Sequence, residues 1–222
     1  ICFFLNSCAN IVMPTGGEKD TAPPKLSHTS PENNTKNFNS KNAVFVFDEN
    51  IQTNSWAENF NISPATKNPI KYKVQNKTLT IDLENQLEEN TTYCLNLNNC
   101  IRDINEGNIL EKLNLSFSSG EILDSLKLTG KVLDAMSLEP ISNTKVFLQE
   151  TDVIDSLCFE KKPKYTTKTN KNGVFTMSNL NNNNYSIFCI TGIDFAYHDG
   201  DLIGFYETKV NALDSIEIIL LL

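Results

Sequence analysis

Six cysteines and two histidines are the residues of this 222-residue chain best suited to bind a metal or to act as nucleophile and base. They are Cys2, Cys8, Cys94, Cys100, Cys158, Cys189, His28 and His198. The cysteines make no C-x-x-C pair, and neither histidine lies near a cysteine pair in sequence, so the spacing does not favour zinc. We therefore expect no metal site and no cofactor.

Residues that could serve in a hydrolase adjoin both histidines. Ser27 and Ser30 flank His28, and Asp199 follows His198. The sequence contains neither G-x-S-x-G nor H-E-x-x-H, and neighbours in sequence do not make a triad, because catalytic geometry is spatial. We expect no catalytic residues and no enzyme. A cleft joining His198, Asp199 and a nucleophile would reverse that expectation.

Cys94 and Cys100 are the pair that most invites a disulfide. Six residues of extended strand span about 20 Å, whereas a disulfide tolerates roughly 7 Å between Cα atoms. The two could pair only if the chain turns back between them. Small buried or half-buried side chains are the favoured interpretation.

Cys8 follows a short apolar run, since residues 1–8 read ICFFLNSC. This resembles the end of a bacterial lipoprotein signal peptide, with Leu5-Asn6-Ser7-Cys8 as the lipobox. The resemblance implies that residues 1–7 are a signal peptide remnant, that cleavage precedes Cys8, and that Cys8 carries several acyl chains. Each buried methylene contributes about 0.8 kcal/mol, so several chains would anchor the protein stably. The alternative is a first strand at residues 2–5, with Cys8 an ordinary thiol.

The following segment, residues 8–24, has no periodic apolar pattern and is rich in glycine and proline, which predicts a lipidated tether. Ala9 stands where an Asp commonly retains lipoproteins in the inner membrane, so the resemblance implies the outer membrane and leaves open which side the protein faces. We expect no transmembrane span, because no run of about 18 apolar residues occurs.

The net charge of the chain indicates whether nucleic acid could be a partner. The net charge is −8 and the sequence pI is about 4.8. Nucleic-acid binding needs clustered Lys and Arg, so we expect no nucleic-acid partner. Lys161, Lys162 and Lys164 are the one local basic cluster, which is favoured to be a solvated loop.

The elements that must position these residues are strands. Leu79, Ile81 and Leu83 alternate with polar residues, and the same period of two recurs along the chain, as expected for half-buried antiparallel sheets. The fold class is therefore all-β, with two tandem antiparallel Ig-like β-sandwich domains at 25–120 and 121–222. Strands are expected at 43–47, 72–74, 78–83, 93–97, 113–117, 126–133, 145–148, 165–169, 174–177, 185–190 and 215–222, and a short helical or irregular crossover at 52–59.

Residues 8–120 resemble the bacterial Ig-like domain found in lipoproteins of the Bacteroidetes, often named SbsA Ig-like. The resemblance is carried by Cys8–Asn10, Pro14–Asp20 with Pro23-Pro24, Ser30–Asn33, Val44–Glu49, Ile62–Pro64, Asn90–Tyr93, Asp103–Asn108 and Phe117–Gly120. Residues 126–222 resemble the carboxypeptidase-regulatory-like, or transthyretin-like, domain. That resemblance is carried by Leu128–Val132, Glu139-Pro140, Val146–Leu148, Thr169–Phe175 and Asn179-Leu180. It implies no zinc ligands and no peptidase activity.

Local patterns add finer expectations. Tyr93 looks like the tyrosine-corner position of Ig-type sandwiches. In the loop 103–108, Asp103 and Glu106 could bind calcium, but a turn with positive φ at Gly107 is favoured, because calcium needs about six oxygens. Asn172-Gly173 predicts a hairpin turn in which both residues can take positive φ. The last residues, 218–222, lack alternation, which predicts a strand covered on both faces or an edge strand.

The function predicted from these features is that of a cell-envelope lipoprotein acting as a structural spacer or interaction module. The alternative is a carbohydrate- or protein-binding adhesin of the outer membrane. Its candidate aromatic platforms are Trp56, Phe60, Tyr197, Phe205 and Tyr206. Exposure of these rings on a sheet face would favour binding, and their burial would favour the spacer.

Overall fold

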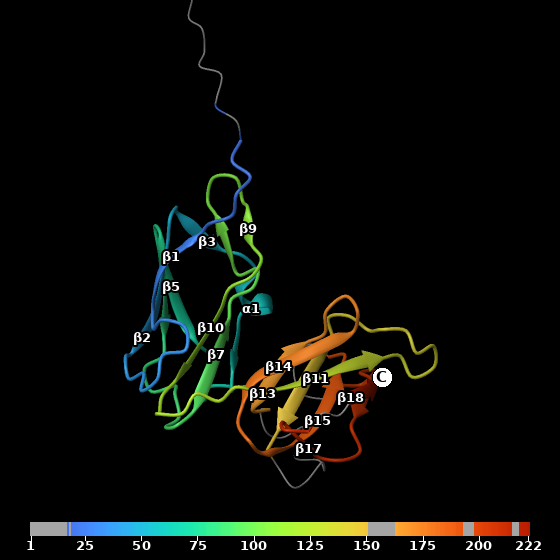
Figure 1. Ribbon diagram of the computed structural model, residues 1–222. Coiled ribbons are helices and arrows are strands. Elements are labelled where there is room, and N and C mark those ends of the chain that lie inside the picture. Colours follow the sequence, from blue (N-terminus) through green and yellow to red (C-terminus); the bar gives the residue numbers. More distant parts are fainter. Residues whose placement is uncertain (1–16, 18, 151–162, 193–197, 215–217) are drawn as a thin grey trace, which may run out of the picture.

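The computed structural model describes residues 17, 19–150, 163–192, 198–214 and 218–222. Cys8 and the remnant 1–7 lie outside the described residues, as do Cys2, Cys158, Lys161, Lys162 and Tyr197. Nearly all regular structure is strand, arranged as two sandwiches joined end to side (Figure 1). The predicted all-β fold class is confirmed.

The first sandwich packs a four-stranded sheet against a three-stranded one. The first sheet has the order β1 (Leu26–Ser30), β2 (Asn42–Phe47), β6 (Thr78–Asp82), β5 (Lys71–Gln75), and the second the order β10 (Asn114–Ser118), β7 (Thr92–Asn96), β4 (Asn61–Ser63). A small sheet of β3 (Ile51–Thr53), β8 (Ile101–Asp103) and β9 (Ile109–Leu110) lies near the segment 19–25 that precedes β1 (Figure 1). The single helix among the described residues, α1 (Trp56–Asn59), occupies the expected crossover.

The alternating apolar residues of these strands face each other and form the first core. Phe45 pairs with Leu79, and Tyr93 pairs with Phe117, each in register on the inner face of its sheet. All four side chains are fully buried in one hydrophobic cluster. Fully burying side chains of this size contributes about 1.5 to 3 kcal/mol each, and this burial fixes which face of each strand points to solvent.

The second sandwich has its own core. One sheet has the order β14 (Val174–Leu180), β11 (Leu126–Leu133), β18 (Ile218–Leu221). The other has the order β13 (Tyr165–Lys168), β12 (Lys145–Gln149), β15 (Asn184–Ile190), β16 (Ile203–Phe205), with β17 (Val210–Asn211) also paired to β15. β11 and β18 are parallel, and every other pairing between the described strands is antiparallel.

Two local predictions need correction or refinement. The hairpin at residues 170–173 is present, but of its residues only Gly173 has a positive φ, of 68°, because the turn closes from Gly173 N to Asn170 O and needs one left-handed residue. β18 is an edge strand and is not covered on both faces, since Ile219 and Leu221 are exposed while Ile218 and Leu220 are buried.

Candidate functional site

The connection between the sandwiches is pinned on both sides. The backbone N–H of Asp124 donates to Thr92 Oγ1 of the first sandwich at 2.9 Å. The carbonyl of Asp124 accepts from Asn179 Nδ2 of the second at 3.0 Å. Asn179 Oδ1 also accepts from Ser116 Oγ on β10 at 3.0 Å. One asparagine therefore links the connecting segment to both domains.

A second set of contacts joins the edge strands β4 and β13 on the other side of the junction. Asn61 Nδ2 donates to the carbonyl of Thr166 at 2.8 Å, and the backbone N–H of Ala65 donates to the carbonyl of Lys164 at 2.6 Å. Lys168 Nζ reaches the carbonyl of Glu58 in α1 at 3.1 Å. The two sandwiches are thus hydrogen-bonded to each other at two separate places.

Between these two places lies a cleft of about 450 Å³. Its floor is the outer face of the β10-β7-β4 sheet, where pairing places two rows of polar side chains across three strands. One row is Asn61, Asn96, Asn114 and the other is Ser63, Cys94, Ser116.

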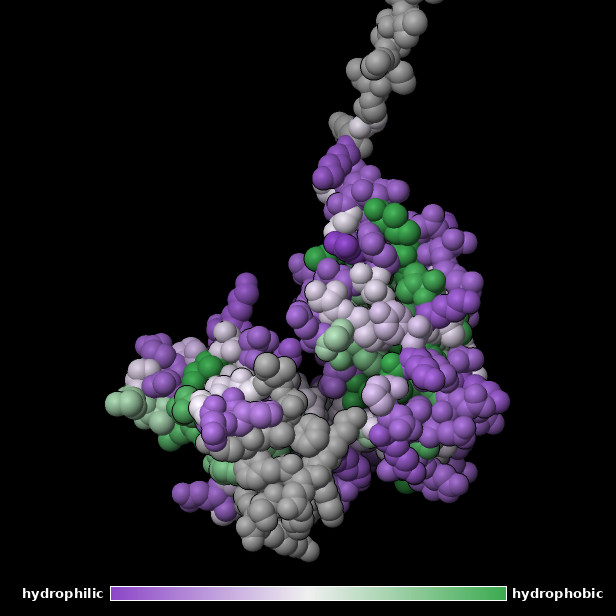
Figure 2. Space-filling view, turned by 180° about the vertical axis from the view of Figure 1, so that it is seen from behind, coloured by the Kyte–Doolittle hydropathy of each residue, from purple (hydrophilic) through white to green (hydrophobic). Residues whose placement is uncertain are grey.

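The opposite wall of the cleft comes from the second sandwich. Thr166 and Thr167 contribute from β13, Thr176 and Ser178 from β14, and Lys127 from β11. Among the described residues that line the cleft, Lys127 alone is charged. In the space-filling view a notch separates the two lobes (Figure 2). Most of the lining consists of hydroxyl- and amide-bearing residues suited to hydrogen bonding, alongside Cys94, Met177 and Lys127, and the described lining residues include no His, Asp or Glu.

Tyr93 makes the contact that its sequence position predicts. It is 1% exposed, and its hydroxyl accepts a hydrogen bond from the backbone N–H of Glu88 at 2.8 Å. Burial raises the pKa of the Tyr93 phenol above its ordinary value. The tyrosine-corner prediction is therefore confirmed.

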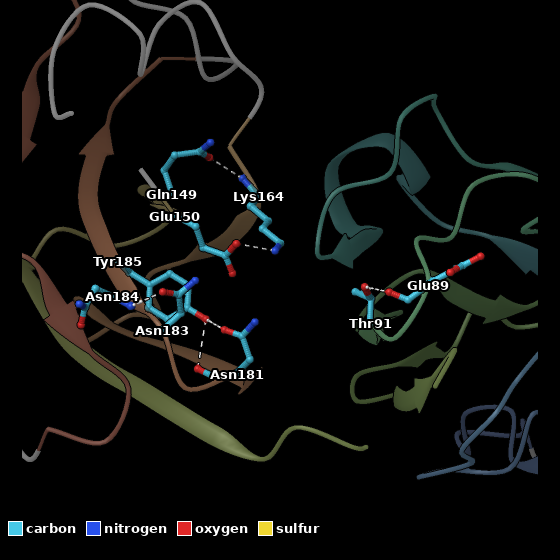
Figure 3. A network of polar contacts seen from close by, with 9 residues as sticks. All are labelled: Glu89, Thr91, Gln149, Glu150, Lys164, Asn181, Asn183, Asn184 and Tyr185. Carbon is cyan, nitrogen blue, oxygen red and sulfur yellow. Dashed lines mark hydrogen bonds and ion pairs between the residues drawn. The ribbon is translucent and has the colours of Figure 1, made fainter. Parts of the chain in front are cut away.

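The second sandwich carries a comparable contact that sequence reasoning missed. Tyr185 is fully buried in β15, and its hydroxyl contacts two acceptors of Asn181, four residues upstream: the side-chain Oδ1 and, at 3.2 Å, the backbone carbonyl (Figure 3). The close-up also shows the ion pair of Glu150, just after β12, with Lys164, just before β13, in which Lys164 Nζ and Glu150 Oε2 lie 2.7 Å apart. The sequence signal for this contact is a Tyr at the second position of a strand, directly after the run Asn181–Asn184.

The aromatic residues proposed as binding platforms are partly used for packing. Trp56 stacks on Phe60 at 4.4 Å and on Tyr72 at 3.9 Å between ring centroids. Two near-parallel rings at these distances must cover opposite faces of the indole, because one face has no room for both. Trp56 and Phe60 also pack against the first core. Phe205 is 40% exposed and Tyr206 is half-buried.

The loop 103–108 is a closed turn. Asp103 accepts hydrogen bonds from the backbone N–H groups of Glu106, Gly107 and Asn108 at 2.6 to 2.8 Å, and Gly107 has a φ of 81°. These bonds hold the pKa of the Asp103 carboxyl below its ordinary value, against the opposing effect of desolvation. Both carboxylate oxygens are engaged, so the predicted turn at Gly107 is confirmed.

The histidines and cysteines fall in separate places. His28 lies on β1 of the first sandwich, whereas His198 lies in the second with Nδ1 3.6 Å from Asp201. Cys94, Cys100 and Cys189 are free thiols, half-buried or buried, as expected. Over the described residues no group of three or more His, Cys, Asp or Glu is placed to hold a metal ion. Nor does that part of the chain contain a helix long and apolar enough to cross a membrane.

Comparison with solved structures gives weak likenesses. The N-terminal part of the bacterial S-layer protein SbsC is 12% identical over 82% of this chain, with a TM-score of 0.30, and the chain spans 43% of that protein. BcpA, the major pilin subunit of Bacillus cereus, is 12% identical over 90% of this chain and 69% of its own, with a TM-score of 0.28. At such scores these likenesses carry no functional inference.

Comparison with protein families is more specific. No curated protein matches the sequence. Residues 20–119 match the family described as the bacterial Ig-like domain, Big_5, a range that contains β1 to β10. The predicted resemblance to a bacterial Ig-like domain is confirmed over this range. The chain therefore carries a bacterial Ig-like domain at residues 20–119.

Proposed function

We propose that this protein is a lipid-anchored component of the bacterial cell envelope, in which two sandwiches act as a stiff spacer. The observation that carries the spacer role is the hydrogen-bonded junction, where Asn179 binds both the connecting segment and Ser116 while Asn61 bonds to β13. A flexible linker would let domains reorient independently, whereas a pinned one fixes their angle.

The direction of the tether supports this role. Figure 1 shows the N-terminal segment leaving the first sandwich at the end remote from the second. Asn108 Nδ2 holds this exit by donating to the carbonyls of Asp20 and Ala22, both at 3.1 Å. An anchor at Cys8 would then hold the second sandwich beside the end of the first that faces away from the membrane.

The remaining parts of the proposal rest on sequence resemblance. The lipobox at Leu5–Cys8 supports lipidation, and Ala9 supports the outer membrane. The likeness of residues 126–222 to carboxypeptidase-regulatory-like domains supports a non-enzymatic second sandwich. The membrane is then the partner at one end.

Residual dipolar couplings test the stiffness. The proposal expects one alignment tensor to fit both sandwiches of the full chain. Asn179→Gly keeps the left-handed backbone, since its φ is 59°, but removes both bonds of the side chain, so we expect the two tensors to diverge. Asn143→Gly is the control, because Asn143 has a φ of 58° away from the junction. Different tensors in the wild-type chain would overturn the spacer role.

Detergent partitioning with intact-mass measurement tests the anchor in the native bacterium. We expect the wild-type protein to enter the detergent phase with the added mass of acyl chains, and Cys8→Ser to remain in the aqueous phase without it. An aqueous wild-type protein of unmodified mass would refute the anchor and leave the spacer geometry untouched.

A further inference from the structure

We propose that the cleft between the sandwiches binds a neutral oligosaccharide. This goes beyond the spacer role and does not depend on the lipid anchor. The first argument is the register of the floor, where Asn61, Asn96 and Asn114 stand side by side on β4, β7 and β10. Neighbouring strands lie about 4.8 Å apart, so the three amides form a row roughly 10 Å long, comparable to two linked sugar rings.

The second argument is the hydrogen-bonding capacity that the row retains. Asn61 uses its Nδ2 on Thr166, which leaves its carbonyl oxygen, and Asn96 uses its Oδ1 on the N–H of Asn98, which leaves its amide nitrogen. Asn114 is exposed, and its side chain has no hydrogen bond with any other described residue. Each amide offers a donor, an acceptor or both, which matches sugar hydroxyls that donate and accept at once.

The third argument is charge. The protein has a net charge of −8, yet the lining of the cleft includes one charged residue, Lys127, among those described. The wall formed by the second sandwich includes the neutral residues Thr166, Thr167 and Thr176. Burying an ionic ligand costs free energy unless charged groups pair with it, and apart from Lys127 the described lining offers none. The lining therefore favours an uncharged polyhydroxyl ligand over phosphate or uronic acid.

The fourth argument separates a sugar from an extended peptide. Strand addition requires a free sheet edge, and the β10 edge of the floor sheet is occupied by the segment at Asn34 and Thr35. On β10, Ser116 O accepts from Asn34 N at 2.6 Å and Ser118 N donates to Thr35 O at 2.8 Å. On the β4 side, the N–H of Ala65 donates to Lys164 O. At its β10 edge the floor therefore presents no open backbone to a ligand, and beside β4 the Asn61 side chain and the Ala65 N–H bond to the segment that holds β13.

The test is a titration of the ¹⁵N-labelled full chain with maltotriose, cellotriose and triacetylchitotriose, followed through backbone and Asn side-chain amide signals. We expect saturable shifts from at least one sugar at Asn61, Asn96, Asn114 and Thr176. We expect Asn114→Ala to weaken that affinity about fivefold, the effect of losing one net hydrogen bond, with an otherwise unchanged spectrum. Asn105→Ala, an exposed asparagine in the 103–108 loop, is the matched control and should bind as wild type.

Several results would overturn the assignment. They are the absence of saturable shifts with all three sugars, shifts centred outside the cleft, and equal binding by the Asn114→Ala variant. Tighter binding of trigalacturonate would show an anion site instead. Binding of an uncharged tetrapeptide in place of the sugars would show a peptide site.

Discussion

Tyr93 and Tyr185 hold comparable positions in two sandwiches of different connectivity. Each is the second residue of its strand, each is essentially fully buried, and each hydroxyl bonds to backbone four or five residues upstream. A buried aromatic ring ties a strand to the core while its hydroxyl ties the preceding turn to the strand. The two contacts differ in direction, since Tyr93 accepts and Tyr185 donates.

The Tyr93 hydroxyl gives the first prediction. Tyr93→Phe leaves the partly buried N–H of Glu88 without its acceptor, so we expect the free energy of unfolding of the first sandwich to fall by about 1 to 3 kcal/mol in urea. Tyr72→Phe is the control, because Tyr72 is 40% exposed and its stacking ring is retained. An equal loss in both variants would contradict the role of the hydroxyl.

The buried thiols give a prediction about alkaline pH. Burial raises the pKa of Cys100 and of Cys189 to about 12. A thiol in the unfolded chain ionises near pH 8.5, so above that value the unfolded state binds fewer protons than the native state. The contribution of these thiols to stability is complete below about pH 8.5 and is lost toward pH 12, by about 1.4 kcal/mol per thiol per pH unit at most.

Urea midpoints measured between pH 8 and pH 11 test this slope. The double variant Cys100→Ala with Cys189→Ala should show a shallower fall than wild type, because it retains only the other alkaline groups, such as Tyr185. A parallel fall in both proteins would show that the two thiols do not contribute.

At the scale of elements, Gly204 governs how β16 approaches β18. A Cβ on Gly204 would lie 2.2 Å from the carbonyl oxygen of Leu221 and 3.0 Å from the sulfur of Cys189. We expect Gly204→Ala to cost about 1 to 3 kcal/mol of unfolding free energy, because backbone of the edge strand must move. Gly17→Ala, with open space around its Cβ position, should cost nothing measurable. An unchanged unfolding free energy in Gly204→Ala would show that β16 can move away from β18 at no cost.

The sequence predicts the long strands well, since period-two alternation at 78–83, 93–97 and 126–133 reflects one buried face. It does not predict β3, β4, β8, β9, β16 or β17, because two or three residues are too few to show a period, nor β1, whose mostly exposed residues show no alternation. The parallel pairing of β11 with β18 joins residues about 90 apart and leaves no local signal.

The cleft could not be predicted for a related reason. Asn61, Asn96 and Asn114 occupy outward positions that are indistinguishable in sequence from ordinary solvent-facing residues. They become a row only through strand register, and a cleft only through the second sandwich, so information from both domains is needed. The tyrosine corner at Tyr93 was predictable because its signal is local.

At the scale of the whole molecule, the junction decides whether the chain behaves as one body or two. The hydrogen bonds of the junction lie on both sides of the cleft. If one set were lost, the two sandwiches could rotate about the other set, and the cleft would widen. The same side chains therefore serve two purposes, because Asn61 both bridges the domains and lines the proposed binding surface. Stiffness and ligand binding are expected to change together when Asn61 is substituted.

The parallel pair of β11 and β18 has a mechanical consequence. Gly130 to Leu133 pair with Ile218 to Leu221. Tension applied at Leu126 and Leu222 therefore pulls the two strands past each other and loads all their hydrogen bonds at once. Leu126 is instead the antiparallel neighbour of Leu180, so tension between those two residues would separate β11 from β14 one pair at a time.

Single-molecule pulling distinguishes the two geometries. We expect the second sandwich of the full chain to yield at a clearly higher force when held at Leu126 and Leu222 than when held at Leu126 and Leu180, and equal forces would refute the idea. Force transmitted between Leu126 and Leu222 would then load this strand pair in shear, the direction in which a short strand pair resists most.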